Sequence, residues 1–328
     1  ESDGARKLPI KAPADHEPPL PDFADSVVVL VGLSGLGKPL TDAWVHRPAL
    51  FSKLAGVPEG TTITSDLLVR VLISARGGLK NIPDGARKIL VINQIDEFPN
   101  WKTFYSHLPC LLGYYNRVVF GVLEEELILE QWQNTAGILL AAGESSRLGQ
   151  PKQLLDWKGV PFVRAAARTA LQAGLDPVIV VTGSWEAEVR EALRELPVIF
   201  VSNPDWEEGQ GTSVARGLEL VPETCGGAVF LLSDQPHIPA RLIKKLLQTQ
   251  ARTGARIAAP RVNGRQANPV LFDRSLFKDL SVLSGDRGGR ALFDQHPIRY
   301  VNWNDPGILL DVDTDSDYQK LLEFYRDR

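Results

Sequence analysis

An apolar strand that runs straight into a loop of glycines and cations, over residues 138–153, constrains this chain more than any other feature. The run reads ILLAAGESSRLGQPKQ. Its first four residues predict a buried strand, and its loop contains Gly143, Gly149, Arg147 and Lys152. Glycines let backbone N–H groups approach an anion closely, and the two cations neutralise its charge. The pattern predicts a triphosphate-binding loop at the carboxyl end of the strand. The alternative is an ordinary exposed loop between a strand and a helix.

From residue 136 onward, short apolar runs alternate with helix-like segments. The predicted strands are 137–141, 178–181, 198–202, 228–232 and 256–259. Helices are predicted near 161–173, 186–194 and 239–252, and Thr212 or Ser213 is expected to cap another. Buried strands separated by helices favour a doubly wound, mostly parallel, Rossmann-like α/β sheet. Ligands bind at the carboxyl ends of the strands in such sheets, so the loops that follow these strands are expected to converge.

Aspartates that follow apolar runs are candidates for a metal site. Asp234 comes directly after AVFLLS, and Asp311 and Asp313 lie in ILLDVDTDSD. Mg²⁺ prefers a few carboxylates together with substrate phosphates and water. We favour Asp313 as the second ligand, because Thr314 begins the turn into the next helix. The alternatives are a helix cap at Asp234 and a solvated acidic turn at Asp313.

Further loops are candidates for substrate contacts. The loop NPDWEEGQGTS is rich in glycine and hydroxyls, and its Asn203, Gly209 and Ser213 suit a base or a ribose. A plain helix cap after a flexible loop is the alternative. The loop GDRGGR carries Arg287 and Arg290 among glycines, which suits an anion on a second substrate. Such a loop is as often merely exposed.

The first 130 residues predict a separate α/β domain. Strands are predicted at 27–31, 88–92 and 117–122, and helices at 43–56, 66–74 and 101–115. The acidic, mixed run LEEELILEQWQNT predicts the boundary, which gives domains 1–130 and 136–328. The run GLSGLGKP almost matches a phosphate-binding P-loop. Its Pro39 has neither a hydroxyl nor an N–H and disfavours a helix start, so we predict that it is not one.

Charge and cysteine content argue against several classes of protein. The net charge is −4 and the pI about 5.8, with no basic block interleaved with aromatic residues, so no nucleic-acid partner is expected. No apolar run approaches the ~20 residues of a membrane span, so no membrane association is expected. Cys110 and Cys225 indicate neither a disulfide framework nor a zinc site. A reducing, cytoplasmic location fits this usage best.

Residues 136–328 resemble the molybdenum cofactor cytidylyltransferases, within the wider nucleotidyltransferase fold. Six segments occur in that family's order: LLAAGESSRLGQPKQLL, NPDWEEGQGTSVARGL, LLSDQP, NPVLF, GDRGGR and DVDTDSDY. The resemblance implies Mg²⁺-dependent transfer of CMP from CTP to the terminal phosphate of molybdopterin, with release of pyrophosphate. It also implies that molybdenum hydroxylases are clients that receive the product.

The resemblance and the loop chemistry together assign roles to particular residues. Arg147, Lys152 and Asp234 are expected to be catalytic, and Asp234 and Asp313 to hold the metal. The residues expected to bind the nucleotide are Leu140, Ala141, Ala142, Gly143, Ser145, Arg147, Gly149, Lys152, Thr182, Gly183, Asn203, Gly209 and Ser213. The acceptor phosphate is already ionised, so no general base is needed, and His237 is expected to be structural.

The second alanine of L-A-A-G bears on the choice of nucleotide. The related guanylyltransferases usually carry L-A-G-G, and the methyl group of Ala142 is expected to narrow the base pocket in favour of a pyrimidine. Residues 267–269 read Ala-Asn-Pro where the family often has Gly-His-Pro, which puts a pterin contact at that position in doubt. The alternatives are GTP as donor, a sugar or alcohol phosphate as acceptor, and a non-catalytic carrier of the molybdenum cofactor.

The first domain resembles a family of selenium-dependent hydroxylase accessory proteins. The supporting segments are SDGARKLPIKAPADHEP, VGLSGLGKPL, HRP, GGLKNIP and INQID. Members resemble P-loop NTPases and carry the phosphate loop near the N-terminus, so this domain is expected to be partial and to lack that loop. Asp3, Lys11 and His16 are expected to mark the edge of the former site. A truncated domain retained for packing is the alternative to an active one.

Overall fold

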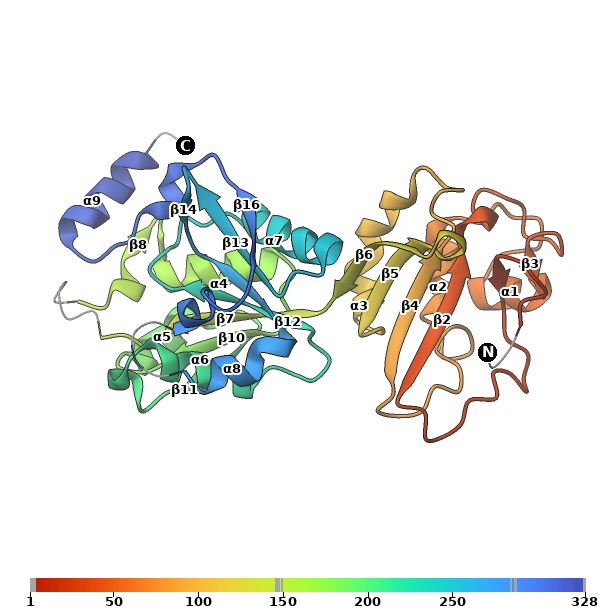
Figure 1. Cartoon of the computed structure of the whole chain (residues 1–328), viewed down its shortest axis with the longest axis horizontal. Helices are drawn as coiled ribbons and strands as arrows, with labels where there is room; N and C mark the ends of the chain where they lie inside the picture. Colours follow the sequence, from red (N-terminus) through yellow and green to blue (C-terminus); the bar gives the residue numbers. More distant parts are fainter. Residues whose placement is uncertain (1–3, 145–147, 149, 284, 286–287, 327–328) are drawn as a thin grey trace. The chain divides into compact units, whose positions relative to one another are not determined.

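The computed structural model describes residues 4–326, apart from residues 145–147, 149, 284, 286 and 287. Contacts between Cα atoms divide the chain into two units, Glu1–Gln133 and Asn134–Arg328. Both units are α/β (Figure 1). The confirmed fold class is thus mixed α/β, with a large Rossmann-like sheet in the second unit.

The second unit is built on an eight-stranded sheet in the order β11-β10-β7-β12-β15-β13-β14, with β16 paired to β13. The parallel part consists of β7 (Thr135–Ala141), β10 (Val178–Thr182), β11 (Val198–Ser202) and β12 (Gly227–Leu232). The remaining strands are β13 (Ile257–Val262), β14 (Arg265–Gln266), β15 (Val270–Asp273) and β16 (Ile298–Asn302). Strand β15 is antiparallel to both of its neighbours, β12 and β13, and sequence reasoning did not predict it.

Helices cover both faces of this sheet, as the alternation of strands and helices predicts (Figure 1). One apolar core packs α4 (Phe162–Gln172), α5 (Glu186–Ala192) and α7 (Ala240–Thr253) against the face that includes Leu139 and Val180. The other packs α6 (Gln210–Glu219) and α8 (Phe277–Ser281) against Ile138 and Val181. Because side chains alternate along a strand, each of these uniformly apolar strands supplies both cores.

The predicted cap of α6 at Thr212 or Ser213 is wrong. The helix begins at Gln210, and its N-cap is Gly209, whose φ of 108° lies in the region that favours glycine. The Thr212 hydroxyl instead donates to the Gly209 carbonyl oxygen at 2.9 Å. The glycine lets the chain turn sharply into the helix one turn earlier than expected.

Strand β7 lies between β10 and β12, and this position gathers the loops. Ala141 pairs with Thr182 of β10, and Leu140 pairs with Leu232 of β12. Parallel strands in this register end at one edge of the sheet. The loops after β7, β10 and β12 therefore start side by side, and the last helix, α9 (Asp315–Phe324), follows the acidic segment predicted to join them.

The first unit has a smaller four-stranded sheet in the order β2-β4-β5-β6. The helices and strands of this unit are β1 (Ile10–Lys11), β2 (Ser26–Gly32), β3 (Val45–His46), α1 (Pro48–Ala55), α2 (Ser65–Leu72), β4 (Arg87–Asn93), α3 (Leu108–Leu112), β5 (Arg117–Val122) and β6 (Leu127–Gln133). Strands β1 and β3 pair with each other in a separate two-stranded sheet. Three expectations need correction. The helix predicted at 43–56 begins only at Pro48, a 3₁₀ helix takes up 101–107 of the segment predicted as helical, and most of the acidic run 123–135 is strand β6.

The P-loop-like run does not lead into a helix. A short 3₁₀ turn over Leu33–Gly35 follows β2, and Pro39 forms an isolated bridge with Thr62. The Ser34 hydroxyl donates to Gln94 Oε1 at 2.9 Å, so the INQID segment contacts this turn. The geometry agrees with the expectation that this run is not a phosphate loop.

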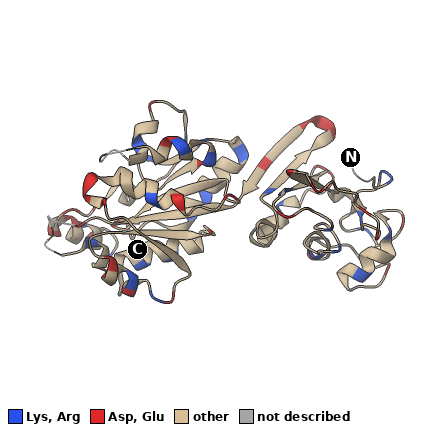
Figure 2. Ribbon diagram, turned by 90° about the horizontal axis from the view of Figure 1, so that it is seen from below, with Lys and Arg blue, Asp and Glu red and all other residues tan. Residues whose placement is uncertain are grey.

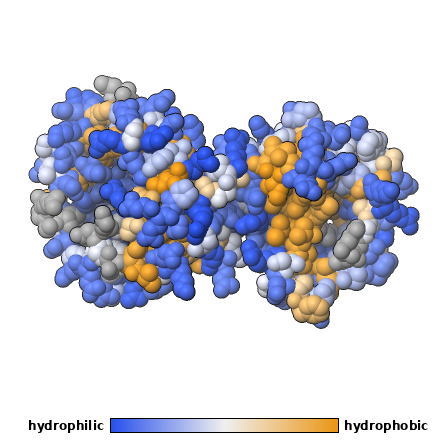
Figure 3. Space-filling view, viewed as in Figure 1, coloured by the Kyte–Doolittle hydropathy of each residue, from blue (hydrophilic) through white to orange (hydrophobic). Residues whose placement is uncertain are grey.

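One face of the first unit's sheet is apolar and exposed. Val31, Leu90 and Phe120 point into the core, whereas Val28 and Leu30 on β2 are 59% and 58% exposed. The patch is visible over β2 and β4 in Figure 3. Acidic residues gather at the turn between β5 and β6, and elsewhere lysines and arginines are mixed with acidic residues (Figure 2).

Candidate active site

Lys152 lies between two of the predicted metal ligands. Its Nζ atom is 2.7 Å from Asp234 Oδ2 and 3.1 Å from Asp313 Oδ1. The three residues come from different parts of the chain: a 3₁₀ turn over Lys152–Leu154, the end of β12, and the residue before Thr314. Thr314 caps α9 through a capping box with Asp317, which fixes the chain beside Asp313. The sequence-predicted cation and both preferred carboxylates are therefore brought together.

One of the two carboxylate oxygens of Asp234 lacks a hydrogen-bond partner among the described residues. This oxygen, Oδ1, is buried. Burial raises the pKa of Asp234 and outweighs the opposing effect of Lys152. A buried, unpaired carboxylate oxygen is costly unless a cation or a donor satisfies it. The Oδ1 atom of Asp234 is therefore suited to bind a divalent cation.

Carboxylates raise the pKa of Lys152, even though burial acts in the opposite direction. The ammonium group is thus kept charged at the edge of the sheet. No cluster of three or more His, Cys, Asp or Glu side chains suited to a metal is found in the part of the chain that the structure describes. A cation here would need substrate phosphates or water in addition to the two aspartates, as Mg²⁺ commonly does.

Asp311 occupies a different place from Asp313. Gln235 Nε2 donates to Asp311 Oδ1 at 2.7 Å, which ties the segment before α9 to the residue after Asp234. Sequence reasoning did not single out Gln235, because a neutral amide next to an aspartate gives no signal of its own. Its position suggests that it fixes the distance between the two acidic segments.

Gln153 is a second residue that sequence reasoning missed. It is 2% exposed, and its Nε2 atom donates to the carbonyl oxygens of Ala141 and Gly143, at 3.3 and 2.6 Å. The side chain thereby holds the start of the glycine-rich loop. Trp185 Nε1 donates to the Glu144 carbonyl oxygen at 2.9 Å and supports the next residue of that loop. The predicted residues Ser145, Arg147 and Gly149 lie outside the described residues, as do Asp3 and Arg287.

Gly183 allows the loops after β7 and β10 to touch. A Cβ atom at this position would lie 2.6 Å from the Ala142 carbonyl oxygen and 2.9 Å from the Ala142 Cβ atom. Ser184 N also donates to that carbonyl at 3.2 Å. The methyl group of Ala142 is 5% exposed and belongs to the core beneath the loop. Thr182 is fully buried, and its hydroxyl donates to the Val201 carbonyl at 3.2 Å.

Asn203 holds its own loop together. Its side chain is fully buried and donates to the hydroxyls of Thr212 and Ser213, both at 2.9 Å, while its Oδ1 accepts from Asp205 N at 3.1 Å. These contacts use its hydrogen-bonding groups inside the segment 203–213. Asn203 and Ser213, which were predicted to bind the nucleotide, thus position the loop that starts α6.

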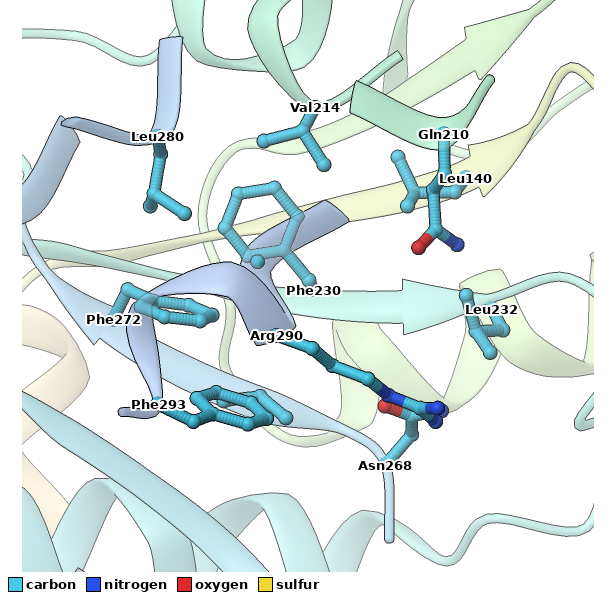
Figure 4. A pocket seen from close by; sticks show the side chains of 12 residues that line it. Leu140, Gln210, Val214, Phe230, Leu232, Asn268, Phe272, Leu280, Arg290 and Phe293 are labelled. Atoms are coloured by element: carbon cyan, nitrogen blue, oxygen red, sulfur yellow. The ribbon is translucent and has the colours of Figure 1, made fainter. Parts of the chain in front are cut away.

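A cavity of about 210 Å³ opens beside these loops (Figure 4). Leu140, Val214 and Phe230 form part of its apolar wall. Arg290 and Asn268 point toward one another at its polar side in Figure 4. A neighbouring cavity of about 330 Å³ shares Asn268 and Arg290 and adds Arg265, Gln235 and Asp311. The two cavities therefore meet at Arg290, which the sequence had suggested for an anion on the second substrate.

Family models match both units. The model described as the MobA-like NTP transferase domain matches residues 137–300. The model described as YqeC protein matches residues 1–49. The first match runs from β7 to β16 and includes Lys152, Asp234 and all the residues that line the 210 Å³ cavity. No helix among the described residues is long and apolar enough to span a membrane.

Individual relatives resemble the chain over slightly more than half its length. The nicotine blue oxidoreductase of Paenarthrobacter nicotinovorans is 32% identical, and the alignment covers 57% of this chain and 95% of that protein. The molybdenum cofactor cytidylyltransferase of Escherichia coli is 28% identical with the same two coverages. The solved structure of Rv0371c from Mycobacterium tuberculosis is 32% identical, with a TM-score of 0.55, covering 58% of this chain and 98% of that one. A further structure of Rv0371c is a complex with manganese.

Proposed function

The chain belongs to the MobA-like NTP transferase family, and we propose that it transfers CMP from CTP to the terminal phosphate of molybdopterin, with release of pyrophosphate. The nucleotidyltransferase framework follows from the family. The donor, the acceptor and the metal are the proposal. The single observation that carries it is the grouping of Lys152, Asp234 and Asp313 at the edge of the sheet where the glycine-rich loop begins.

The proposed reaction depends mainly on positioning the two substrates and on neutralising the charge of their phosphates. An oxygen of the acceptor phosphate attacks the α-phosphorus of CTP and forms the new P–O bond. The bond from the α-phosphorus to the bridging oxygen breaks, and pyrophosphate leaves with that electron pair. Lys152 lies where it can neutralise charge on the leaving group, and no side chain has to remove a proton because the attacking phosphate is ionised.

A divalent cation is part of the proposal. Asp234 and Asp313 would hold it, and it would neutralise phosphate charge when bound. The unpaired Oδ1 atom of Asp234 supports this assignment. The manganese complex of Rv0371c shows that a protein of similar sequence binds such an ion. We prefer Mg²⁺ because two carboxylates with phosphates and water form its usual surroundings.

The paired cavities at Arg290 are the proposed acceptor site. Arg290 and Arg265 would attract the acceptor phosphate, and the apolar wall would contact the rest of the acceptor. Asn268 occupies the position where the cytidylyltransferases often have histidine, and it lines both cavities. We therefore propose that Asn268 contacts the acceptor in spite of this departure. Molybdenum hydroxylases would be the clients that receive the product.

CTP is preferred to GTP on the basis of Ala142. Its methyl group fills the space where the loops after β7 and β10 meet, next to Gly183. A chain with glycine at this position would leave more room for a purine. The E. coli cytidylyltransferase among the relatives is consistent with cytidine.

The experiment that tests this function measures pyrophosphate release from CTP and from GTP, with Mg²⁺, in the presence and absence of molybdopterin. We expect release from CTP only, and only when molybdopterin is present. Release from GTP would overturn the choice of nucleotide. If folded protein releases no pyrophosphate from either nucleotide, the transferase reaction is wrong. The carrier hypothesis, and the redox chemistry named for the Paenarthrobacter relative, would then be tested by direct cofactor binding and by substrate oxidation.

A further inference from the structure

A separate pocket of about 730 Å³ is lined by residues that follow Asp234 closely in the chain. Gln235 lines the proposed acceptor site, whereas the following residues, Pro236 and His237, line this second pocket. Its other walls come from the β8–β9 turn, the start of α7, the segment after β16 and the end of α9. Strands β8 and β9 are Asp156–Trp157 and Val160–Pro161. Of the described residues assigned to catalysis or to the metal, Lys152, Asp234 and Asp313 do not line this pocket.

Two buried side chains that line the pocket have ring nitrogens without a hydrogen bond of normal geometry to a described residue, although their rings contact neighbouring side chains. His237 is 8% exposed and Trp303 is 9% exposed. Both ring nitrogens of His237 and the Nε1 atom of Trp303 lack a hydrogen bond of normal geometry to any described residue. An indole nitrogen can only donate, and leaving such a donor buried and unpaired costs free energy. A ligand that brings acceptor atoms into the pocket would remove that cost.

The rim of the pocket is cationic. Arg241 and Lys245 lie one turn apart on α7, each 5.2 Å from the ring centre of Trp303. Lys158 lies 5.5 Å from the ring centre of Trp157. The opposing charge is Asp305, which accepts a hydrogen bond from Gly307 N at 3.0 Å.

Burial lowers the pKa of His237 to about 4, so this side chain adds no positive charge near neutral pH. More cations than carboxylates line the pocket, and this favours an anion such as a phosphate group, which carries about −1.5 to −2 charge at pH 7. The volume is larger than a bare phosphate needs, and Trp157, Pro236 and Tyr325 provide an apolar floor. The combination fits a phosphate joined to a compact organic body.

We propose that this pocket is a second ligand site, distinct from the nucleotide and acceptor sites, which binds a small organic phosphate. Trp303 Nε1 and His237 donate to its oxygens, and Arg241 and Lys245 neutralise its charge. The body of the ligand contacts the floor formed by Trp157 and Tyr325. The site rests on its own residues and stands whether or not the proposed transferase reaction is correct.

The test follows the indole N–H resonance of Trp303 in ¹⁵N-labelled full-length protein by NMR. The chain has seven tryptophans, and Trp303→Phe identifies the resonance by its disappearance. The probes are phenyl phosphate, inorganic phosphate and benzoate. We expect phenyl phosphate to shift the Trp303 resonance saturably, and at lower concentration than inorganic phosphate or benzoate. If no probe shifts it, or if benzoate binds as tightly as phenyl phosphate, the proposal is overturned.

Matched variants locate the binding. The double variant Arg241→Gln/Lys245→Gln should weaken phenyl phosphate at least about tenfold, because it removes two charged partners. Lys244→Gln removes an exposed cation of the same helix that does not line the pocket, and it should change the affinity by less than about twofold. Lys152→Gln should leave the Trp303 shift intact. Equal weakening by K244Q, or loss of the shift in K152Q, would assign the effect to general charge or to the nucleotide site.

Discussion

Lys152 Nζ and Asp234 Oδ2 lie 2.7 Å apart, although the loop and the strand end that carry them are more than eighty residues apart in the sequence. The pair exists because β7 and β12 are neighbours in the sheet and end at the same edge. Without Asp234, Lys152 would be an ordinary loop cation, and without Lys152 the buried carboxylate of Asp234 would have no cation beside it. Together with Asp313 they form the charged centre at which we propose that a phosphate chain and a cation bind.

Asp234→Asn should abolish the proposed transfer while preserving the fold. The amide keeps the size of the side chain but removes the negative charge that the cation and Lys152 contact. We expect turnover to fall at least about 100-fold, since removing one electrostatic contact to a transition state has effects of this size. Pyrophosphate release measures it, and circular dichroism controls for folding. Near wild-type release from folded D234N would remove Asp234 from the mechanism and favour a carrier.

Ala142→Gly should relax the choice of nucleotide. Removing the methyl group frees space beside Gly183, and under the proposal this space is available to the base. The preference for CTP over GTP, measured as the ratio of the two kcat/KM values, should fall about tenfold, the usual worth of one methyl group in a pocket. An unchanged ratio would show that other residues choose the base.

Gly183→Ala should destabilise the protein, whereas Gly143→Ala should not. The new methyl group at Gly183 would meet a backbone oxygen at 2.6 Å, so the two loops must separate, at a cost of about 1–3 kcal/mol. A Cβ atom at Gly143 meets nothing within 4 Å. The contrast is measured as the melting temperature of the second unit. Equal melting temperatures would mean that the loops are not held in contact.

Gly143→Ala has a separate expected effect on binding, because the methyl group would stand in the open space where the phosphates are expected. The KM for CTP should rise although the melting temperature is unchanged. This separates a packing role for Gly183 from a substrate-approach role for Gly143. A KM equal to that of the wild type would place the phosphates elsewhere.

Arg290→Gln should act on the acceptor and not on the nucleotide. Arg290 lines both cavities of the proposed acceptor site, and losing its charge should raise the KM for molybdopterin about tenfold with the KM for CTP nearly unchanged. Arg299→Gln, on the exposed side of β16, serves as the matched control. If R290Q raises the KM for CTP instead, the cavity belongs to the nucleotide.

Glu17→Gln should destabilise the first unit at neutral pH, and the destabilisation should become smaller in acid. Glu17 accepts hydrogen bonds from Arg47 Nη1 and Nη2 at 2.6 and 2.9 Å, and Lys11 lies 2.9 Å away. The Arg47 guanidinium holds the pKa of Glu17 well below its usual range. A depressed carboxylate pKa stabilises the folded state fully above the ordinary value of 4.5, and this stabilisation is lost progressively as the pH falls from there through the depressed pKa of the folded state.

The expected loss at pH 7 is about 1–3 kcal/mol, because Glu17 has charged partners and is only slightly exposed. Urea unfolding at pH 7 and at pH 3, compared with the wild type, measures it. The exposed Glu59→Gln is the control and should have no effect at either pH. A difference between E17Q and the wild type that does not shrink in acid would contradict the ion-pair explanation.

The sequence predicts the centre of the second sheet well, because a short, uniformly apolar run next to a glycine-rich loop, such as residues 137–141, is typical of a buried strand. It does not predict β15, whose four residues are too few to show a period. Strand β6 is missed because LILEQWQ mixes charges with apolar residues. Its Glu130 is 3% exposed and accepts a hydrogen bond from Tyr105, a distant residue that only the fold brings close to it.

The same limit applies to the site. Charged residues and glycines in loops are typical of phosphate-binding sites, so Lys152, Asp234 and Gly183 can be predicted as candidates from their types and spacing. Gln153 and Gln235 carry no charge and no special backbone geometry. Their roles depend on which carbonyl or carboxylate lies opposite them, and that is a property of the folded chain.

Strand β6 ends at Gln133 and β7 begins at Thr135, so a single residue, Asn134, separates the two sheets along the chain. Asn134 is itself engaged, because its carbonyl oxygen accepts from Gly226 N at 2.8 Å, and the Thr135 carbonyl accepts from Asp176 N at 3.0 Å. The position of a cut between the two units therefore matters to within one or two residues. A fragment beginning at residue 136 would open inside the central strand and lose both bonds, whereas one that retains residues 134 and 135 keeps the strand that organises the active edge.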